Sequence, residues 1–267
     1  MISRIVTLTS DFGLRDPYVA EMKAVILSIC PEATIVDITH EIEKFNVRAG
    51  AVALASAASY FPKGTVHVAV VDPGVGTRRR PILVQTGQGV FVGPDNGVLI
   101  PAADKEEITH IYEITNTELM LSHVSNTFHG RDIFAPIAAH LSNGISPTDC
   151  GPEIDDAVKP EFTKFTSTKE TLIGEILHVD DFGNVITNVR EPEAREFNDG
   201  DWLTVELPNR DLRLRFAKTY AEAKPKEPIA LIGSHGYVEI ALNQGSANKE
   251  FHIRIGDRFK LIRNKKD

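Results

Sequence analysis

Residues 68–81 read VAVVDPGVGTRRRP, and this stretch decides which fold we expect for the chain. Residues 68–71 form a short apolar run rich in valine, which is typical of a strand buried in a parallel sheet. Asp72 then stands at the carboxyl end of that strand, where ligands bind in open α/β sheets. The glycines at 74 and 76 permit a tight turn. The chain therefore brings an arginine back toward Asp72, and an acid and a fixed cation share one small site.

The pattern around this stretch alternates strands with helices, from residue 4 to about residue 145. Repetition of strand, crossover helix and strand predicts an α/β domain with a mostly parallel sheet, which we place at residues 1–165. The expected strands lie at residues 5–8, 34–38, 66–71, 82–85 and 90–93, and the expected helices at 18–29, 48–59 and within 134–141.

The character of the sequence changes after residue 152. Residues 153–170 carry mixed charge without a periodic apolar pattern, which indicates a linker. Short strand-like segments separated by Gly, Asn, Asp and Pro follow, and they predict a small antiparallel β-barrel or sandwich over residues 171–267. We expect those strands at residues 172–179, 185–189, 202–207, 213–216, 229–232, 237–241 and 251–255.

Composition narrows the class of partner. Lys and Arg number 29 against 37 Asp and Glu, and the net charge of −8 argues against a general nucleic-acid or anionic-membrane binder, so we expect a small-molecule partner. Cys30 and Cys150 lie far apart and match no metal-binding spacing, which favours a reduced, cytoplasmic protein. No apolar run approaches the roughly 20 residues that span a bilayer.

Two clusters in the α/β domain carry groups capable of chemistry. Asp11 follows the first strand, where an acid can accept both hydroxyls of a ribose. Asp16, just before the first helix, is equally well explained as a helix N-cap. His129 lies in a loop ahead of an apolar helix, where it either relays protons or has a structural role. We expect Asp132 to cap that helix or to place its charge at the helix terminus.

Two clusters in the β domain are ordinary turns that are also compatible with binding. Residues 180–184, Asp-Asp-Phe-Gly-Asn, predict a hairpin turn that could also present an aromatic face and an amide to a flat ring. Residues 233–237 and 243–247 form polar loops.

Several motifs are missing. Gly74-Val75-Gly76 is neither a dinucleotide fingerprint nor a phosphate loop. Asp37, His40 and Glu41 place possible metal ligands close together, yet no paired histidines or cysteines complete a zinc set, so we expect no metal. A serine nucleophile elbow is also absent.

Four motifs in this order, TSDFGLRDPYV at 9–19, VVDPGVGTRRR at 70–80, FHGRDIF at 128–134 and DDFGN at 180–184, resemble the S-adenosyl-L-methionine hydroxide adenosyltransferase family. The resemblance implies an N-terminal α/β domain, a C-terminal β-barrel, and a homotrimer with active sites between one subunit's N-terminal domain and its neighbour's C-terminal domain. It implies hydrolysis of S-adenosyl-L-methionine to adenosine and L-methionine, in which that molecule is the substrate and no cofactor is required.

The resemblance also implies the catalytic groups. The family's acid, arginine and histidine match Asp72, Arg79 and His129, which leaves Arg78 and Arg80 as solvated or structural charges. The related halogenases carry tyrosines at the positions of Asp72 and His129, a halide-binding serine at the position of Gly130, and a long insertion where this chain has only residues 86–89. These differences point to water as the nucleophile.

The binding residues follow from the same resemblance. Asp11 would hold the ribose hydroxyls, and either Asp180 or Asp181 the methionine ammonium. The remaining contacts implied for the adenosyl and amino-acid groups are Phe45, Phe182, Asn184, Ser234, Gln244 and Ala247. His235 stands where the fluorinase has an arginine, so no carboxylate contact is carried over there. The alternatives are a halogenase that forms 5′-halogenated adenosine and a non-catalytic sensor of adenosyl ligands.

Overall fold

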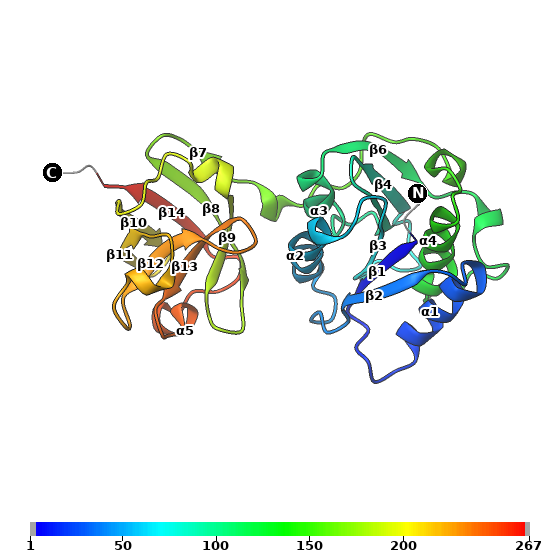
Figure 1. Ribbon diagram of the computed structural model, residues 1–267, viewed down its shortest axis with the longest axis horizontal. Coiled ribbons are helices and arrows are strands. Elements are labelled where there is room, and N and C mark those ends of the chain that lie inside the picture. Colours follow the sequence, from blue (N-terminus) through cyan, green and yellow to red (C-terminus); the bar gives the residue numbers. More distant parts are fainter. Residues whose placement is uncertain (1–3, 265–267) are drawn as a thin grey trace. The chain divides into compact units, whose positions relative to one another are not determined.

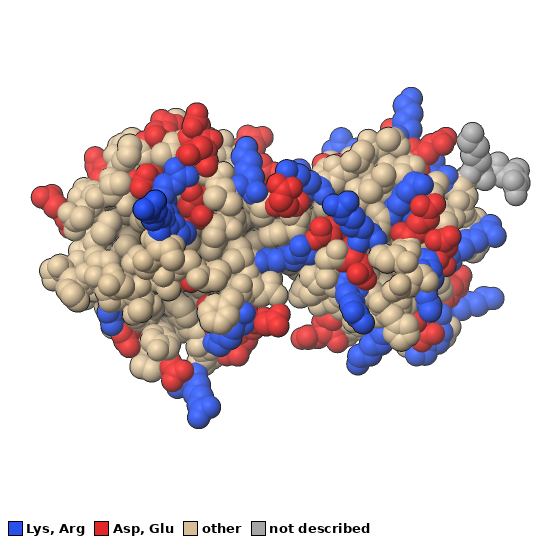
Figure 2. Space-filling model, turned by 180° about the vertical axis from the view of Figure 1, so that it is seen from behind, with Lys and Arg blue, Asp and Glu red and all other residues tan. Residues whose placement is uncertain are grey.

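The computed structural model describes residues 4–264, and the chain divides after Pro160 into two compact units, each with its own core (Figure 1). The face shown in Figure 2 carries both acidic and basic side chains over both units. No helix within residues 4–264 is long and apolar enough to cross a membrane.

The first unit contains a six-stranded sheet in the order β2-β1-β3-β5-β4-β6. Strands β1, β2, β3 and β5 run parallel, whereas β4 is antiparallel to both of its neighbours. The predicted α/β class is therefore confirmed. The strands are β1 (Ile5–Ser10), β2 (Thr34–Thr39), β3 (Val66–Val70), β4 (Pro81–Thr86), β5 (Val90–Pro94) and β6 (Ile108–Glu113).

Helices cover both faces of this sheet, as Figure 1 shows. They are α1 (Tyr18–Ile29), α2 (Val47–Ala57), α3 (Ile100–Lys105) and α4 (Ala135–Ser142). Val68 and Val70 pack with α1 and α4, while Ala69 and Val71 face the core formed by α2 and α3. Strand β3 is thus buried on both faces, which explains the apolar run at residues 68–71. Because β1, β3 and β5 are parallel, the residues that follow them meet at one edge of the sheet.

A buried histidine lies within this sheet. His67 is 2% exposed, stacks on Phe91 with ring centroids 4.8 Å apart, and places Nδ1 2.8 Å from Oγ1 of Thr7. Burial lowers the pKa of His67 from 6.5 to about 4. The unfolded chain therefore binds this proton at a higher pH than the folded chain, and the stabilisation held above pH 6.5 is lost as the pH falls toward 4.

We expect this histidine to make the first unit acid-sensitive. Between about pH 7 and about pH 4.5, His67 should cost roughly 2 kcal/mol of unfolding free energy. Urea unfolding followed by circular dichroism at both pH values measures this loss. His67→Asn keeps a polar atom near Thr7 but cannot titrate, so its loss over the same interval should be smaller by that amount. An equal loss in both proteins would refute the assignment.

The second unit is a closed barrel of seven strands with one short strand, β7 (Thr166–Ser167), attached to β8. The strand order is β14-β10-β11-β12-β13-β9-β8, and pairing of β14 with β8 closes the ring. All pairs are antiparallel except β11 with β12. The predicted barrel is confirmed. Its strands are β8 (Thr171–Val179), β9 (Val185–Arg190), β10 (Trp202–Leu207), β11 (Arg210–Phe216), β12 (Pro228–Ile232), β13 (Tyr237–Leu242) and β14 (Arg258–Arg263).

Some local predictions are wrong. Residues 251–255, predicted as a strand, contain the end of α5 (Ala247–Phe251) and a turn in which His252 is left-handed, with φ at 56°. The last barrel strand is instead β14, in which the buried Phe259 and Leu261 lie on either side of Lys260. Asp16 does not cap α1, because Pro17 stands at the N-cap position without a side-chain hydrogen bond.

Candidate active site

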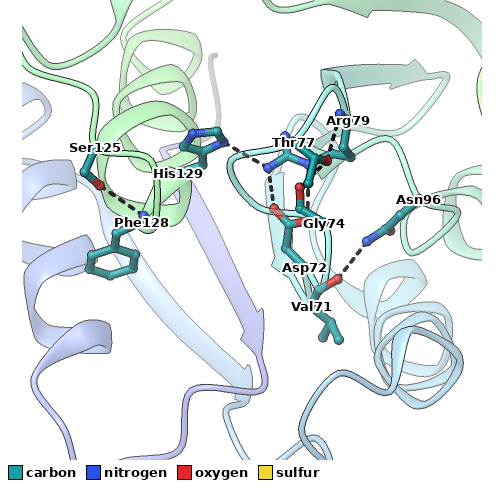
Figure 3. Close-up of polar contacts among 9 residues, drawn as sticks. All are labelled: Val71, Asp72, Gly74, Thr77, Arg79, Asn96, Ser125, Phe128 and His129. Carbon is teal, nitrogen blue, oxygen red and sulfur yellow. Dashed lines mark hydrogen bonds and ion pairs between the residues drawn. The ribbon is translucent and has the colours of Figure 1, made fainter.

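An aspartate and an arginine form a buried ion pair just beyond β3. The turn through Pro73 and Gly76 returns the chain so that Arg79 faces Asp72 (Figure 3). Nε of Arg79 donates to Oδ1 of Asp72 at 3.2 Å, and Nη2 donates to Oδ2. The side chain of Asp72 is only 5% exposed and that of Arg79 only 7%. This two-point contact fixes the orientation of the carboxylate.

His129 extends this pair. Its Nδ1 lies 3.0 Å from Nη2 of Arg79 (Figure 3). A guanidinium only donates, so Nδ1 accepts and the neutral ring carries its proton on Nε2. Burial lowers the pKa of His129, and the positive charge of Arg79 lowers it further, while the charges of Asp72 and Asp132 and a hydrogen bond with the Ser125 backbone act in the opposite direction. The ring is therefore neutral near pH 7, and it acts on Arg79 as an acceptor.

The predicted catalytic residues are thus brought together, and other residues that the sequence did not single out support them. The side-chain amide of Asn96, after β5, donates to the carbonyl of Val71 at 2.8 Å and braces the end of the β3 segment. The ring of Phe134 lies 5.5 Å from Cζ of Arg79, within range of a cation–π contact. Arg80, predicted to be a solvated or structural charge, pairs with Asp95 and Asp156.

At Gly76, the loop that carries Asp72 and Arg79 comes close to the loop that precedes His129. Its φ is +75°, and a Cβ placed there would lie 2.3 Å from the backbone oxygen of Asn126. A side chain at position 76 would therefore impose backbone strain and also push the two loops apart.

We expect Gly76→Ala to lower kcat about tenfold, because a shift of the loops on the order of 1 Å misplaces groups that must act together. Steady-state turnover of the substrate that the family resemblance implies measures the effect. Gly200→Ala is the matched control, since Gly200 has φ +84° but no atom within 4 Å of the added Cβ. Equal turnover in the two variants would show that the Asn126 contact does not matter.

Asp11 lies at the same sheet edge, immediately after β1, whose Ser10 pairs with Val70 of β3. Asp11 is only 6% exposed, and its Oδ2 accepts the backbone N–H of Phe45 at 2.8 Å. Phe45 adopts a φ of 66° and is 70% exposed. A non-glycine residue rarely holds this conformation without a reason, and here it aims its amide at the Asp11 carboxylate.

An aromatic cluster connects this turn with the loop of His129. Phe12 and Tyr18 lie 5.6 and 5.1 Å from the ring of Phe128, both edge-on. Asp132, predicted to cap the helix or to charge its terminus, lies in the first turn of the helical segment Gly130–Phe134 without capping it. It accepts from the backbone of Ser125 at 2.8 Å and from Nε of Arg131 at 2.7 Å. It is fully buried, and its hydrogen bond with Ser125 ties this helical segment to the loop that precedes His129.

In the barrel, the hairpin of residues 180–184 packs against the loop that follows β13. The carboxylate of Asp180 accepts both the backbone N–H and the side-chain amide of Asn184, at 2.8 and 2.9 Å. A Cβ on Gly183 would lie 2.1 Å from Oγ of Ser246, so the hairpin lies close to the predicted Gln244–Ala247 region. Phe182 is 81% exposed and Asp181 is exposed, whereas Ala247 is buried. The hairpin prediction is confirmed.

Ser234 belongs to the exposed turn between β12 and β13 and so lies at the other end of β13 from Gln244.

Glu239, a buried acid that the sequence did not single out, lies close to this turn. Glu239 accepts from the hydroxyl of Tyr220 at 2.5 Å, and its Oε2 would lie 2.4 Å from a Cβ on Gly233. Burial raises the pKa of Glu239, and the charge of Asp180 raises it further although the Tyr220 hydrogen bond lowers it.

The chain matches two family models, the SAM hydroxide adenosyltransferase N-terminal domain over residues 6–151 and the C-terminal domain over residues 174–260. It is 37% identical to a protein of Methanocaldococcus jannaschii named (R)-S-adenosyl-L-methionine hydrolase, over 97% of this chain and 95% of that protein. A fluorinase of Actinopolyspora mzabensis is more distant, at 26% identity over 97% of each chain. The crystal structure of an uncharacterized conserved protein from Thermotoga maritima is similar with a TM-score of 0.88 and 39% identity, covering 97% of this chain and all of that one.

Proposed function

Since the chain belongs to the SAM hydroxide adenosyltransferase family, we propose that it hydrolyses S-adenosyl-L-methionine to adenosine and L-methionine at the Asp72, Arg79 and His129 cluster. The observation that supports this site is the buried carboxylate of Asp72, which accepts two hydrogen bonds from Arg79 at the carboxyl edge of the sheet. Water attacks the ribose 5′ carbon, the carbon–sulfur bond breaks, and its electron pair returns to the sulfur. One proton leaves the water.

The leaving group needs no general acid, because methionine leaves the sulfonium as a neutral thioether. Catalysis therefore acts on the water. Each Asp72 oxygen accepts from Arg79 and keeps a further lone pair with which to accept an O–H of water. Nη1 of Arg79 is buried without a hydrogen-bond partner among residues 4–264, and a bound water oxygen would satisfy it.

The proton acceptor in this scheme is Asp72. Nδ1 of His129 already accepts from Arg79, so the neutral ring offers no free lone pair to a water proton. His129 instead holds the guanidinium in place and completes the polar wall that stabilises developing hydroxide character. The fixed geometry aligns water with the departing sulfur, an effect worth about 7 kcal/mol in favourable cases.

Substrate recognition divides between the two units. We assign the ribose hydroxyls to Asp11 and the adenosyl group to Phe45, Phe182 and Asn184. Asp180 is assigned to the methionine ammonium, because Asn184 already orients its carboxylate, whereas Asp181 is exposed. The remaining contacts, with the amino-acid end and the adenine, come from Ser234, Gln244 and Ala247. The protein acts in the cytoplasm as a homotrimer whose sites combine the N-terminal unit of one copy with the C-terminal unit of the next.

One assay tests the activity. Purified protein is incubated with the (R) and (S) sulfonium forms of S-adenosyl-L-methionine, with and without chloride or fluoride, and the products are identified by mass spectrometry. We expect adenosine and L-methionine in equal amounts at many turnovers per subunit. Formation of 5′-halogenated adenosine would make the protein a halogenase, and binding without turnover would make it a sensor. Light scattering tests the trimer.

A further inference from the structure

A second buried network lies beside Asp11, and the proposed reaction does not use it. His40, just beyond β2, is 3% exposed, and its Nδ1 lies 2.7 Å from Oγ of Ser10. Its Nε2 lies 3.2 Å from Oδ1 of Asp37, an ion-pair distance without good hydrogen-bond alignment. Oδ2 of Asp37 accepts from Nζ of Lys23 on α1 at 2.6 Å.

The partners set the direction of each hydrogen bond. Burial alone would raise the pKa of Asp37, but its contacts with Lys23 and His40 outweigh burial and lower it, so Asp37 is a carboxylate. A carboxylate favours the proton on Nε2 of His40, which leaves Nδ1 to accept the hydroxyl proton of Ser10. The hydroxyl oxygen of Ser10 in turn accepts the backbone N–H of Phe12 at 3.3 Å.

These are the residue types of a hydrolase triad, but Ser10 is only 1% exposed and cannot reach a substrate as a nucleophile. The network instead ends on the turn that carries Asp11. The backbone carbonyl of His40 accepts the N–H of Gly13 at 2.7 Å, so His40 holds both ends of that turn.

The same segment also contacts Asp11 directly. Nζ of Lys44 donates to the Asp11 backbone carbonyl, and the N–H of Phe45 donates to its carboxylate. Residues 37–45 thus fix the backbone on either side of Asp11, and they fix one of its carboxylate oxygens. We propose that His40, through Ser10, is a positioning residue that aims the Asp11 carboxylate at the two hydroxyls of the ribose. This inference rests on the proposed function of Asp11.

Calorimetric titration with adenosine and with 2′,3′-dideoxyadenosine tests the proposal, because only adenosine carries the two hydroxyls. His40→Gln keeps an amide near the position of Nε2 but loses the acceptor for Ser10, whereas His40→Asn keeps a polar atom near Nδ1. We expect His40→Gln to weaken adenosine binding roughly tenfold, as for hydrogen bonds to a charged group, without changing dideoxyadenosine binding. His40→Asn should retain most of the preference for adenosine.

Ser10→Ala removes only the hydroxyl and should reproduce the His40→Gln result, and it serves as the test if His40→Gln does not fold. His110→Gln is the matched control, since His110 pairs with Glu153 at 2.8 Å on the exposed strand β6. An equal loss for both nucleosides, or no loss for either, would overturn the positioning role. Asp11→Asn separates the two claims: if it leaves the preference for adenosine intact, the ribose role of Asp11 itself is wrong.

Discussion

Asp72→Asn is expected to lower kcat about 1000-fold, within the range that a positioned proton acceptor contributes. The substitution keeps the size of the side chain but removes its negative charge and turns one oxygen into an amide donor. Both Asp72 oxygens accept from Arg79, so the amide must oppose an arginine N–H, and the guanidinium loses its buried counterion. The water then has a weaker acceptor and a misplaced arginine.

Single-turnover kinetics measure the chemical step, and titration with adenosine checks that the nucleoside site survives. Asp156→Asn is the matched control, because Asp156 also pairs with an arginine of the same loop, Arg80, but is 70% exposed. Its turnover should stay close to that of the wild type. If Asp72→Asn retains turnover within about tenfold of the wild type while still binding adenosine, the carboxylate is not the proton acceptor.

The local pattern was enough to place Asp72 at the carboxyl edge of the sheet, where we propose the site. The apolar run at residues 68–71 is typical of a strand buried on both faces, as β3 is, and Asp72 follows this run directly. The returning Arg79 needed only a short glycine turn. The barrel was predictable as a class from its short strands and turn residues, although three basic residues among the six of β14 obscured that strand.

Contacts between distant segments could not be predicted in this way. Gly76 reads as a turn glycine, yet its main constraint is the backbone oxygen of Asn126, fifty residues further along the sequence. His40 and Asp37 read as an incomplete metal set, because sequence spacing does not show that the third partner is Ser10 on the neighbouring strand. Glu239 stands out as an acid within the buried strand β13, but the sequence does not show that Tyr220 is its partner.

Arg79 is the residue on which these separate segments converge. It contacts Asp72 at two points and His129 at a third, and its guanidinium lies over the ring of Phe134. A planar fork makes these contacts at once, whereas the ammonium of a lysine is a compact point charge that cannot. The geometry of the cation, and not only its charge, should therefore matter for the reaction.

Arg79→Lys tests this distinction, and we expect kcat to fall by at least about 100-fold, the loss seen when one preorganised donor is removed. KM should change little, because Arg79 acts on water and not on the bound nucleoside. Arg80→Lys is the control, since Arg80 makes its ion pairs with Asp95 and Asp156 away from this cluster, and its turnover should match the wild type. Near-normal turnover in Arg79→Lys would mean that a positive charge alone is sufficient. The two hydrogen bonds from Arg79 to Asp72 would then serve folding and not catalysis.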